Sequence, residues 1–413
     1  MNRILHFPPR LNATADLPSS KSLSNRALLL AALSGPASQI HRQSDCDDTQ
    51  VMDRALQLRE PVIDIHGAGT AMRFLTAYFA VCRGEEHVIT GTERMRHRPI
   101  AVLVDALRSL GADIDYEAEE GFPPLRIRGR QLHGGRLELP ADVSSQYISA
   151  LLMIAPILTE GLTLCLLGEV MSRPYIDMTL ELMKCFGARP AWVDAQTIRV
   201  DATGYSPRVD YTVESDWSAA SYWYEMVALT ADPHSRVRLP WLFRQSLQGD
   251  ARVQQFFEPL GVKTVFDGEH GEVILTKQPL TQAQTQTPLR LDLSGQPDLA
   301  QTLVVTCAML RRPFHFTGLR TLRIKETDRM DALKLELRKF GIDLGIIGDE
   351  ALYIDTYPDG VPVYNGEPIS TYDDHRMAMA FAPTAMVTPG VAIAHPEVVS
   401  KSYPHFWDAL DAI

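Results

Sequence analysis

Two cations and a group of hydroxyls open an apolar helix pattern near the start of the chain. Lys21, Ser22 and Arg26 stand directly before a run of Ala and Leu at residues 27–33, and either Ser19 or Ser20 can cap the helix. The first turn of a helix has unpaired N–H groups and a partial positive charge, so it binds anions readily. Ser22 and Arg26 are four residues apart and therefore share a helix face. This stretch predicts an anion site; the alternative is a capped helix whose cations only reach water.

Later apolar patterns in the first half of the chain open in a similar way. A glycine-rich turn at residues 67–69 lets backbone N–H groups approach a phosphate closely, although a tight packing turn is an equal alternative. Three arginines at alternate positions of residues 94–98 would share one side of an extended segment and form a row of cations; a solvated loop is the alternative. Two more expected helices begin with hydroxyl or amide side chains. These could bind a phosphate, or they could simply cap the helices. The candidate residues are Gly69, Arg98, Ser144, Ser145, Gln146, Ser172 and Tyr175.

The second half of the chain adds carboxylates to the cations. Asp298 stands directly before an apolar pattern at residues 299–310, where it is either a cap or, if a ligand reaches it, a general base. Glu326 lies three residues before Arg329, a spacing that ordinary surface helices also show. Residues 373–375 are Asp-Asp-His, but no second carboxylate–histidine cluster accompanies them, so we expect no metal. The remaining candidates are Lys325, Arg376 and Lys401.

Several buried helix patterns therefore begin with anion-binding or acid/base residues. If three helices in each of two domains point the same way, their N-termini and dipoles converge on a cleft between the domains. The expected ligand carries several phosphates or carboxylates, or consists of two anionic molecules.

Length, composition, net charge and cysteine count limit the class of protein. A length of 413 residues predicts two domains, and 45% hydrophobic with 22% charged residues is typical of soluble globular proteins. A net charge of −11 without a long basic run argues against a nucleic-acid partner. Five scattered cysteines without a CxxC pair favour a reducing compartment, and no apolar stretch is long enough to span a bilayer. We expect a cytoplasmic protein that binds neither membrane nor nucleic acid.

Glycines that close helix patterns recur at nearly equal intervals. They are Gly111, Gly187, Gly261 and Gly341. Each suits the left-handed position after a helix and precedes a strand-like stretch. Together with a second series of helix starts, they imply six units, three in each domain, each with two helices and several short strands. The first unit is shortened, since little chain follows Asp48 before the next unit begins. Chance spacing of common glycines is the alternative.

Eight motifs stand in order along most of the chain. They are PSSKSLSNRALLLAAL, GAGTAMRF, RMRHRPI, SSQYISALLM, SRPYIDMTLELM, IKETDRMDAL, YDDHRMAMAFA and SKSYPHFWDAL. In this combination the chain resembles the EPSP synthase family, the 3-phosphoshikimate 1-carboxyvinyltransferases. The resemblance implies an α/β (α+β) fold of two similar domains, residues 16–213 and residues 1–15 plus 214–413, each of three βαβαββ units with buried parallel helices. It also implies transfer of the carboxyvinyl group of phosphoenolpyruvate to the 5-hydroxyl of shikimate 3-phosphate with release of phosphate, a step of the shikimate pathway towards chorismate and the aromatic amino acids.

Carried over by position, the resemblance implies two substrate sites that share residues. For shikimate 3-phosphate it implies Lys21, Ser22, Arg26, Ser144, Ser145, Gln146, Ser172, Tyr175, Asp298, Thr321 and Lys325. For phosphoenolpyruvate it implies Lys21, Gly69, Arg98, Gln146, Arg329, Arg376 and Lys401. Asp298 would take the 5-hydroxyl proton, Glu326 would deliver a proton to the vinyl carbon, and Lys21 would contact both substrates. We expect small-molecule partners only, no cofactor and no metal, and a monomer.

Three positions depart from the family pattern. Gly67 stands where the family usually has Asn, and Phe74 where many members have Pro. Thr321 stands where many members have an Asn that contacts the phosphate of shikimate 3-phosphate, so a hydroxyl would replace that amide.

Three other functions would fit a related fold. UDP-N-acetylglucosamine enolpyruvyl transferases carry a cysteine in the loop that corresponds to residues 91–98, and this chain has none there. A non-catalytic phosphate-binding protein would need neither Asp298 nor Glu326, and both are present. An RNA 3′-phosphate cyclase would need a basic face, which the net charge of −11 disfavours.

Overall fold

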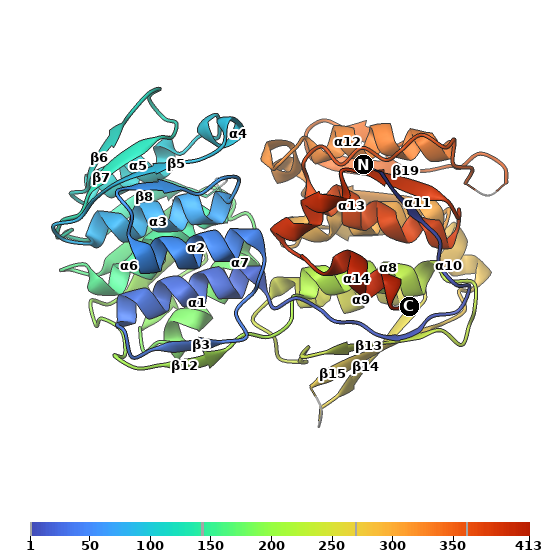
Figure 1. Cartoon of the computed structure of the whole chain (residues 1–413), viewed down its shortest axis with the longest axis horizontal. Coiled ribbons are helices and arrows are strands. Elements are labelled where there is room, and N and C mark those ends of the chain that lie inside the picture. Colours follow the sequence, from blue (N-terminus) through green and yellow to red (C-terminus); the bar gives the residue numbers. More distant parts are fainter. Residues whose placement is uncertain (1, 142–143, 269–270, 361) are drawn as a thin grey trace. The chain divides into compact units, whose positions relative to one another are not determined.

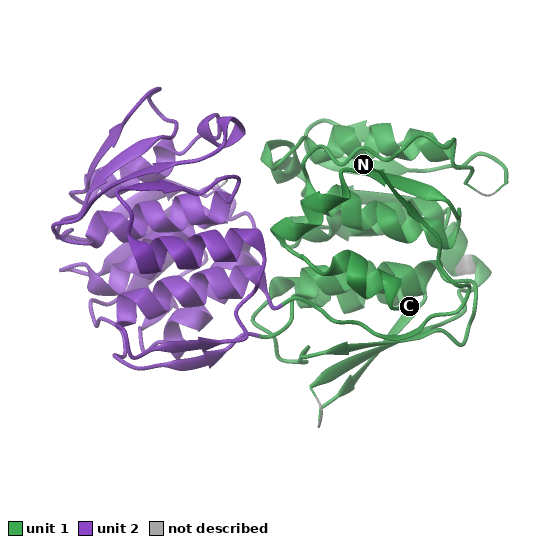
Figure 2. Cartoon of the chain, in the orientation of Figure 1, with its two compact units in different colours: residues 1–18, 214–413 green, residues 19–213 purple. Residues whose placement is uncertain are grey.

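The computed structural model describes residues 2–141, 144–268, 271–360 and 362–413. It divides into two compact units, which Figure 2 colours separately. Unit 1 comprises Met1–Pro18 with Glu214–Ile413, and unit 2 comprises Ser19–Val213. From the sequence we expected the chain to pass from one domain to the other after residue 15, whereas in the structure it does so after Pro18. Each unit is described by itself below.

Unit 2 alternates helices with short strands (Figure 1). Its helices are α1 (Lys21–Ser34), α2 (Asp47–Leu58), α3 (Gly69–Val81), α4 (Glu93–Arg96), α5 (Ala101–Ser109), α6 (Ser145–Ile154), η1 (Ala155–Ile157) and α7 (Arg173–Cys185). Its strands are β3 (Gln39–His41), β4 (Val62–Asp64), β5 (Glu86–Thr90), β6 (Asp113–Tyr116), β7 (Leu125–Arg128), β8 (Gly135–Pro140), β9 (Leu162–Leu167), β10 (Pro190–Trp192), β11 (Thr197–Val200) and β12 (Asp210–Thr212).

Unit 1 has the same alternation and contains both ends of the chain. Its helices are α8 (Trp217–Leu229), η2 (Gly249–Arg252), α9 (Val253–Phe257), η3 (Glu258–Leu260), α10 (Gln282–Gln286), η4 (Pro297–Leu299), α11 (Ala300–Met309), η5 (Arg320–Ile324), α12 (Arg329–Leu337), η6 (Arg338–Phe340), α13 (His375–Phe381), η7 (Ala382–Met386), η8 (Pro396–Lys401) and α14 (Phe406–Asp411). Its strands are β1 (Asn2–Leu5), β2 (Asn12–Thr14), β13 (Arg236–Pro240), β14 (Val262–Asp267), β15 (Glu272–Lys277), β16 (Leu289–Asp292), β17 (Phe314–Thr317), β18 (Gly345–Ile347), β19 (Ala351–Ile354) and β20 (Val391–Ala394).

Four four-stranded sheets repeat one pairing pattern. The strand orders are β4-β5-β7-β6 and β8-β9-β11-β10 in unit 2, and β2-β13-β15-β14 and β16-β17-β19-β18 in unit 1. In each sheet the first pair is parallel and the other two pairs are antiparallel. A helix connects the parallel strands of three of these sheets, and a second helix precedes the antiparallel pair. The predicted α/β architecture is confirmed, and the strands and helices of these four sheets follow the βαβαββ order.

Two smaller pairings complete the units. In unit 2, β12 pairs in parallel with β3, and α2 follows β3 and leads directly to β4. This group therefore has the two helices of a repeat without its antiparallel strand pair. In unit 1, β1 pairs antiparallel with β20, and Ile369 forms a parallel bridge with Ile393.

Buried helices form the centre of each unit. All thirteen residues of α8 are buried, as expected for a helix that is apolar on every side. In unit 2, α3 packs against α2, α6 and α1, and α7 packs against α6 and α1. Sheets lie outside these helices (Figure 1), and alternate residues of β17 point into the core of unit 1.

The helix-closing glycines take the predicted backbone conformation. The φ angles are +101° at Gly111, +87° at Gly187, +82° at Gly261 and +72° at Gly341. Each glycine ends a helical segment in the left-handed region that side chains disfavour, so the repeat signal in the sequence reflects backbone geometry.

Candidate active site

The opening of α1 has the predicted cap and an ion pair. The Ser20 hydroxyl accepts a hydrogen bond from the backbone N–H of Leu23 at 3.4 Å. Lys21 is the first residue of α1, and its Nζ lies 3.1 Å from Oδ2 of Asp48, the second residue of α2. The two helices therefore begin side by side, and a cation with a mostly buried carboxylate stands at their joint opening.

Arg26 lies deeper in unit 2 than the sequence suggested. Its Nε donates to Thr179 Oγ1 at 2.7 Å, its Nη2 to Ser149 Oγ at 3.3 Å, and its Nη1 to the carbonyl oxygen of Ser22 at 2.9 Å. Burial lowers the pKa of Arg26 to about 10, although the neighbouring Tyr175 opposes this shift. Because the guanidinium holds the backbone of Ser22, it fixes the first turn of α1 from beneath.

These contacts also show how the helices of unit 2 are oriented. Arg26, Ser149 and Thr179 each lie in the second turn of their helices, α1, α6 and α7. Since the three side chains meet, the three helices run parallel and begin at one end of the unit. The Gln146 amide donates to Thr70 Oγ1 at 3.2 Å and adds α3 to this set. The predicted gathering of helix N-termini is therefore present in unit 2.

Two arginines point at the glycine that begins α3. A Cβ atom added to Gly69 would lie 2.6 Å from Arg98 Nη1 and 3.3 Å from Arg73 Nη1. Arg73 is buried and donates to the carbonyl oxygen of Gly69 at 3.0 Å. A glycine at position 69 thus lets Arg98 and Arg73 approach the backbone closely. The N-terminus of α3 and two guanidinium groups therefore lie next to one another.

The predicted row of arginines at residues 94–98 is wrong. Thr92 caps a short helix, α4, by accepting from the backbone N–H of Met95 at 3.3 Å. Alternate residues of a helical turn point to different sides, so the three arginines do not form a row. Arg96 Nε donates to the Gly91 carbonyl at 3.1 Å, while Arg98 reaches Gly69.

The other candidates of unit 2 stand at the starts of α6 and α7. Ser144 caps α6 through the N–H of Gln146 at 3.4 Å, and Ser145 is the first helical residue. Ser172 occupies the cap position of α7 in a left-handed conformation with φ of +52°, and its side chain makes no capping hydrogen bond. The N–H of Tyr175 instead donates to the Ser172 carbonyl at 3.0 Å. Side-chain capping of α7 therefore does not explain why a serine stands at position 172.

In unit 1, Asp298 is surrounded by three cations. Arg376 Nη2 lies 3.0 Å from Oδ2 of Asp298, and Arg329 Nη1 lies 3.3 Å from Oδ1. Lys325 Nζ is 3.5 Å from Oδ1. Burial acts to raise the pKa of Asp298, but the charges of Arg376, Lys325 and Arg329 outweigh it and hold that pKa well below its usual range.

A second set of contacts surrounds Arg329, the first residue of α12. Its Nε and Nη2 donate to the two carboxylate oxygens of Asp374 at 2.7 and 3.3 Å. Its Nη2 also reaches Glu326 Oε2 at 3.0 Å, and Lys401 Nζ lies 3.2 Å from Glu326 Oε1. Burial acts to lower the pKa of Arg329, but these carboxylates more than offset it and raise the pKa. Arg329 is therefore a permanent cation held between carboxylates.

We call this set the cation–carboxylate cluster. Its members are Asp298, Lys325, Glu326, Arg329, Asp374, Arg376 and Lys401. Four cations face three carboxylates, so the cluster carries an excess positive charge and suits an anionic ligand. Thr321 lies in η5, close in sequence to Lys325, and its Oγ1 is buried without a hydrogen-bond partner among the described residues. Such an orphan polar atom is expected to have a partner when a ligand is bound.

Two members of the site were missed as candidates by the sequence analysis. Asp48 pairs with Lys21, and Asp374 both pairs with Arg329 and caps α13 by accepting from the N–H of Arg376 at 2.9 Å. Asp374 precedes an apolar helix pattern, which is the usual signal for a cap, but its partner on α12 lies far away in the sequence.

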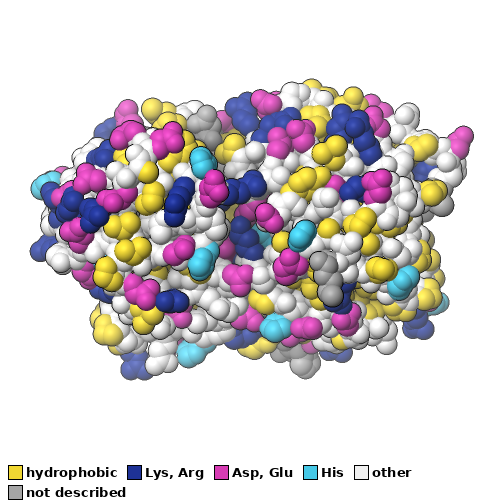
Figure 3. Space-filling model, turned by 45° about the horizontal axis from the view of Figure 1, so that its top comes forward, with side chains coloured by type: hydrophobic (Ala, Val, Ile, Leu, Met, Phe, Trp, Pro, Cys, Tyr) yellow, Lys and Arg dark blue, Asp and Glu magenta, His cyan; other side chains and the backbone are white. Residues whose placement is uncertain are grey.

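Other features of the described residues limit the chemistry. Among them, no group of three or more His, Cys, Asp or Glu could hold a metal ion. Within the same part of the chain, no helix has the length and apolar character to cross a bilayer. Figure 3 shows Lys and Arg side chains interspersed with Asp and Glu over the face drawn.

Comparisons with known proteins agree with this chemistry. The family model for EPSP synthase, 3-phosphoshikimate 1-carboxyvinyltransferase, matches residues 6–60 and 54–410. A 3-phosphoshikimate 1-carboxyvinyltransferase from Bacteroides fragilis is 51% identical over 99% of this chain and 97% of its own length. One from Yersinia pseudotuberculosis is 36% identical over 96% of this chain and 95% of its own.

A solved structure has the same fold. The structure of EPSP synthase from Acinetobacter baumannii superposes with a TM-score of 0.75 at 20% identity, over 99% of this chain and 97% of that one. The full-length matches of sequence lead to one assignment, and the shared fold agrees with it. The chain belongs to the EPSP synthase family of 3-phosphoshikimate 1-carboxyvinyltransferases.

Proposed function

We propose that the chain transfers the carboxyvinyl group of phosphoenolpyruvate to the 5-hydroxyl of shikimate 3-phosphate and releases phosphate. The observation that supports this most directly is the cation–carboxylate cluster, where Asp298 and Glu326 lie among four cations in a chain 51% identical to a protein named for this activity. Anions would bind the cations, and the carboxylates would move protons.

We assign shikimate 3-phosphate to the helix starts of unit 2 together with part of the cluster. Neutral hydroxyl donors at a helix N-terminus suit a phosphate, and Lys21 adds a charge there. The proposed ligand residues are Lys21, Ser22, Arg26, Ser144, Ser145, Gln146, Ser172, Tyr175, Asp298, Thr321 and Lys325. The role of Arg26 would be indirect, since its guanidinium group donates to Ser22, Thr179 and Ser149.

Phosphoenolpyruvate carries a phosphate and a carboxylate, so it needs several cations at once. Bidentate guanidinium groups suit both anions. The proposed ligand residues are Lys21, Gly69, Arg98, Gln146, Arg329, Arg376 and Lys401. Gly69 contributes through its missing side chain, which leaves room for Arg98.

The chemical step requires three proton movements: off the 5-hydroxyl, onto the methylene carbon, and off the methyl group that this forms. The 5-hydroxyl oxygen bonds to the phosphate-bearing carbon of phosphoenolpyruvate while the methylene carbon takes a proton. Loss of phosphate from the first carbon and of a proton from the second restores the double bond. Asp298 would accept the hydroxyl proton. Glu326 would deliver the proton to the methylene carbon and, as the carboxylate then formed, would take a proton back from the methyl group as phosphate leaves.

The substrates themselves would make Asp298 a stronger base. Three cations now hold its pKa well below the usual range, so Asp298 is ionised but weakly basic. Arg329 and Arg376 are proposed to bind phosphoenolpyruvate, and Lys325 the phosphate of shikimate 3-phosphate. When substrate anions bind these cations, the cations stabilise the carboxylate of Asp298 less. The pKa of Asp298 should then rise towards that of an effective base.

We further propose that the chain acts on these small molecules as a cytoplasmic monomer of two domains with three repeats each. The scattered cysteines support a reducing compartment, and the charge of −11 without a long basic run favours small-molecule partners over nucleic acid. Sedimentation of the purified protein tests the monomer, since a dimer would sediment at twice the mass of one chain.

Phosphate release tests the function itself. The purified chain is given phosphoenolpyruvate with shikimate 3-phosphate, or with UDP-N-acetylglucosamine as the control acceptor. We expect phosphate in the first reaction only. Release with the nucleotide sugar alone, or with neither acceptor, would refute the proposal.

A further inference from the structure

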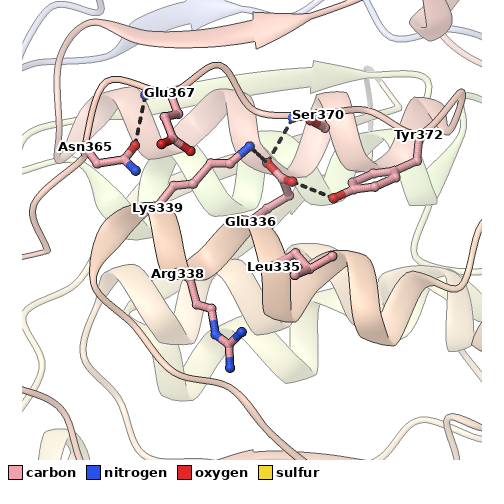
Figure 4. A pocket seen from close by; sticks show the side chains of 8 residues that line it. All are labelled: Leu335, Glu336, Arg338, Lys339, Asn365, Glu367, Ser370 and Tyr372. Carbon is pink, nitrogen blue, oxygen red and sulfur yellow. Dashed lines mark hydrogen bonds and ion pairs between the residues drawn. The ribbon is translucent and has the colours of Figure 1, made fainter.

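A buried glutamate on α12 binds three groups outside the cation–carboxylate cluster. Glu336 Oε2 accepts from Lys339 Nζ at 2.7 Å and from the backbone N–H of Ser370 at 2.9 Å. Its other oxygen accepts from the hydroxyl of Tyr372 at 2.7 Å. Figure 4 shows the carboxylate between these three groups, at the wall of a cavity of about 370 Å³. Lys339 also donates to the Pro368 carbonyl at 2.8 Å, so the pair holds the segment 368–372 at three places.

The segment that Glu336 holds has an unfavourable backbone conformation. Tyr372 and Asp373 both have φ of +54°, the left-handed region that non-glycine residues rarely adopt. Two such residues in succession are energetically unfavourable, so neighbouring contacts must stabilise them. Glu336 supplies those contacts on one side of the turn through Ser370 and Tyr372. Burial, together with the adjacent carboxylate, raises the pKa of Tyr372, so its hydroxyl remains a donor.

On the other side of the turn stands Asp374. Its carboxylate caps α13 at the N–H of Arg376 and pairs with both Nε and Nη2 of Arg329. Arg329 and Glu336 lie on the same helix, two turns apart, and each binds one side of the same turn. The turn is therefore fixed to α12 at both ends, and its geometry sets where the guanidinium groups of Arg329 and Arg376 lie.

We propose that Glu336 and Tyr372 are positioning residues for phosphoenolpyruvate binding, because they hold the left-handed turn that orients Arg329 and Arg376 through Asp374. This inference rests on the proposed function. Neither residue touches substrate in this account. Their loss would loosen the turn and misplace the two arginines, so affinity for phosphoenolpyruvate falls while the shikimate 3-phosphate residues of unit 2 are unaffected.

The test compares four variants of the full chain with the wild type. Glu336→Ala and Tyr372→Phe remove the contacts, and Tyr372→Phe deletes only one hydroxyl, so it keeps the packing of the ring. Glu336→Gln is the conservative variant, since its amide can still accept from Ser370 and donate to the Tyr372 oxygen. Glu367→Gln is the matched control, because it removes one carboxylate charge from the wall of the same cavity. Thermal unfolding of each variant checks that the chain is folded.

We expect Glu336→Ala and Tyr372→Phe to raise KM for phosphoenolpyruvate about tenfold, the equivalent of one charge-assisted hydrogen bond. The Kd of shikimate 3-phosphate should stay within about twofold, and Glu336→Gln should restore most of the loss. If Tyr372→Phe is folded and its KM equals that of Glu367→Gln, the positioning role is wrong. If both KM and the shikimate 3-phosphate Kd rise together, the residues are merely structural, which also overturns the inference.

The same variants separate this inference from the proposed function. A wild-type chain that releases no phosphate would refute the function alone. The positioning role would then be judged by titration calorimetry with inorganic phosphate, where Glu336→Ala should bind about tenfold more weakly than Glu367→Gln. Equal affinities in that titration would refute the positioning role independently.

Discussion

Arg376 donates to the carboxylate of Asp298 at 3.0 Å, so the proposed base and a proposed ligand of phosphoenolpyruvate are direct hydrogen-bond partners. Beside its proposed role as the base, Asp298 therefore also holds the guanidinium group of Arg376.

Replacing the base should reduce turnover strongly. We expect Asp298→Asn to lower kcat about 10²–10⁴-fold, the usual contribution of a positioned general base. Shikimate 3-phosphate should still bind measurably. Asp292→Asn is the control, since Asp292 is an exposed carboxylate on the same segment that accepts from the N–H of Ser294. Steady-state phosphate release checks both variants, and near-normal turnover of Asp298→Asn would remove Asp298 from the mechanism.

The depressed pKa of Asp298 also predicts how stability depends on pH. A carboxylate whose pKa is lower in the folded than in the unfolded chain stabilises the fold above its unfolded pKa, about 3.9, and this contribution is lost as the pH falls through the folded pKa. The wild type should therefore be more stable than Asp298→Asn at pH 7, and the difference should shrink below about pH 4. Urea unfolding at several pH values measures it. A difference that grows towards low pH would contradict the ion-pair description.

Lys21 should matter more than an exposed lysine of the same unit. Lys21 pairs with Asp48 at the joint opening of two helices and is proposed to contact both substrates. We expect Lys21→Met to lower kcat/KM about a hundredfold, as for loss of one charge-stabilising group. Lys184→Met removes a half-exposed lysine paired with Glu181 on α7 and should leave activity within about twofold. Equal losses in the two variants would reduce Lys21 to an ordinary charge at a helix end.

A methyl group at Gly69 should displace Arg98. The added Cβ would lie 2.6 Å from Nη1 of Arg98, the mobile end of a flexible side chain, so the protein should fold with its guanidinium moved. We expect Gly69→Ala to raise KM for phosphoenolpyruvate about tenfold. Gly268→Ala is the control, since its Cβ would meet nothing within 4 Å. An unchanged KM in Gly69→Ala would exclude Arg98 from binding this substrate.

Local sequence patterns predicted what depends on local structure. The serine cap of α1 and the left-handed glycines that close the helices follow from rules that act within a few residues. The α/β repeat followed from their spacing, because each repeat needs a turn at the same place. The shared opening of α1, α6 and α7 was predicted only as a hypothesis, and the contacts of Arg26 demonstrate it.

Contacts between distant residues could not be predicted in this way. The predicted row of arginines is wrong because Thr92 caps a helical turn, whereas the prediction assumed an extended segment. Asp374 and Glu336 looked like ordinary helix residues, since their partners lie on other elements. Tyr372 and Asp373 adopt a left-handed turn without a glycine to signal it. Such positions are held by tertiary contacts and therefore leave no local pattern in the sequence.

The proposed function requires that the cations and carboxylates of this chain act on phosphoenolpyruvate with shikimate 3-phosphate as the acceptor. The most direct measurement is phosphate release by the wild-type chain, followed beside Asp298→Asn and a reaction with UDP-N-acetylglucosamine. We expect rapid release that needs shikimate 3-phosphate and is about 10²–10⁴-fold slower in the variant. Release that does not depend on shikimate 3-phosphate, or that Asp298→Asn leaves intact, would contradict it.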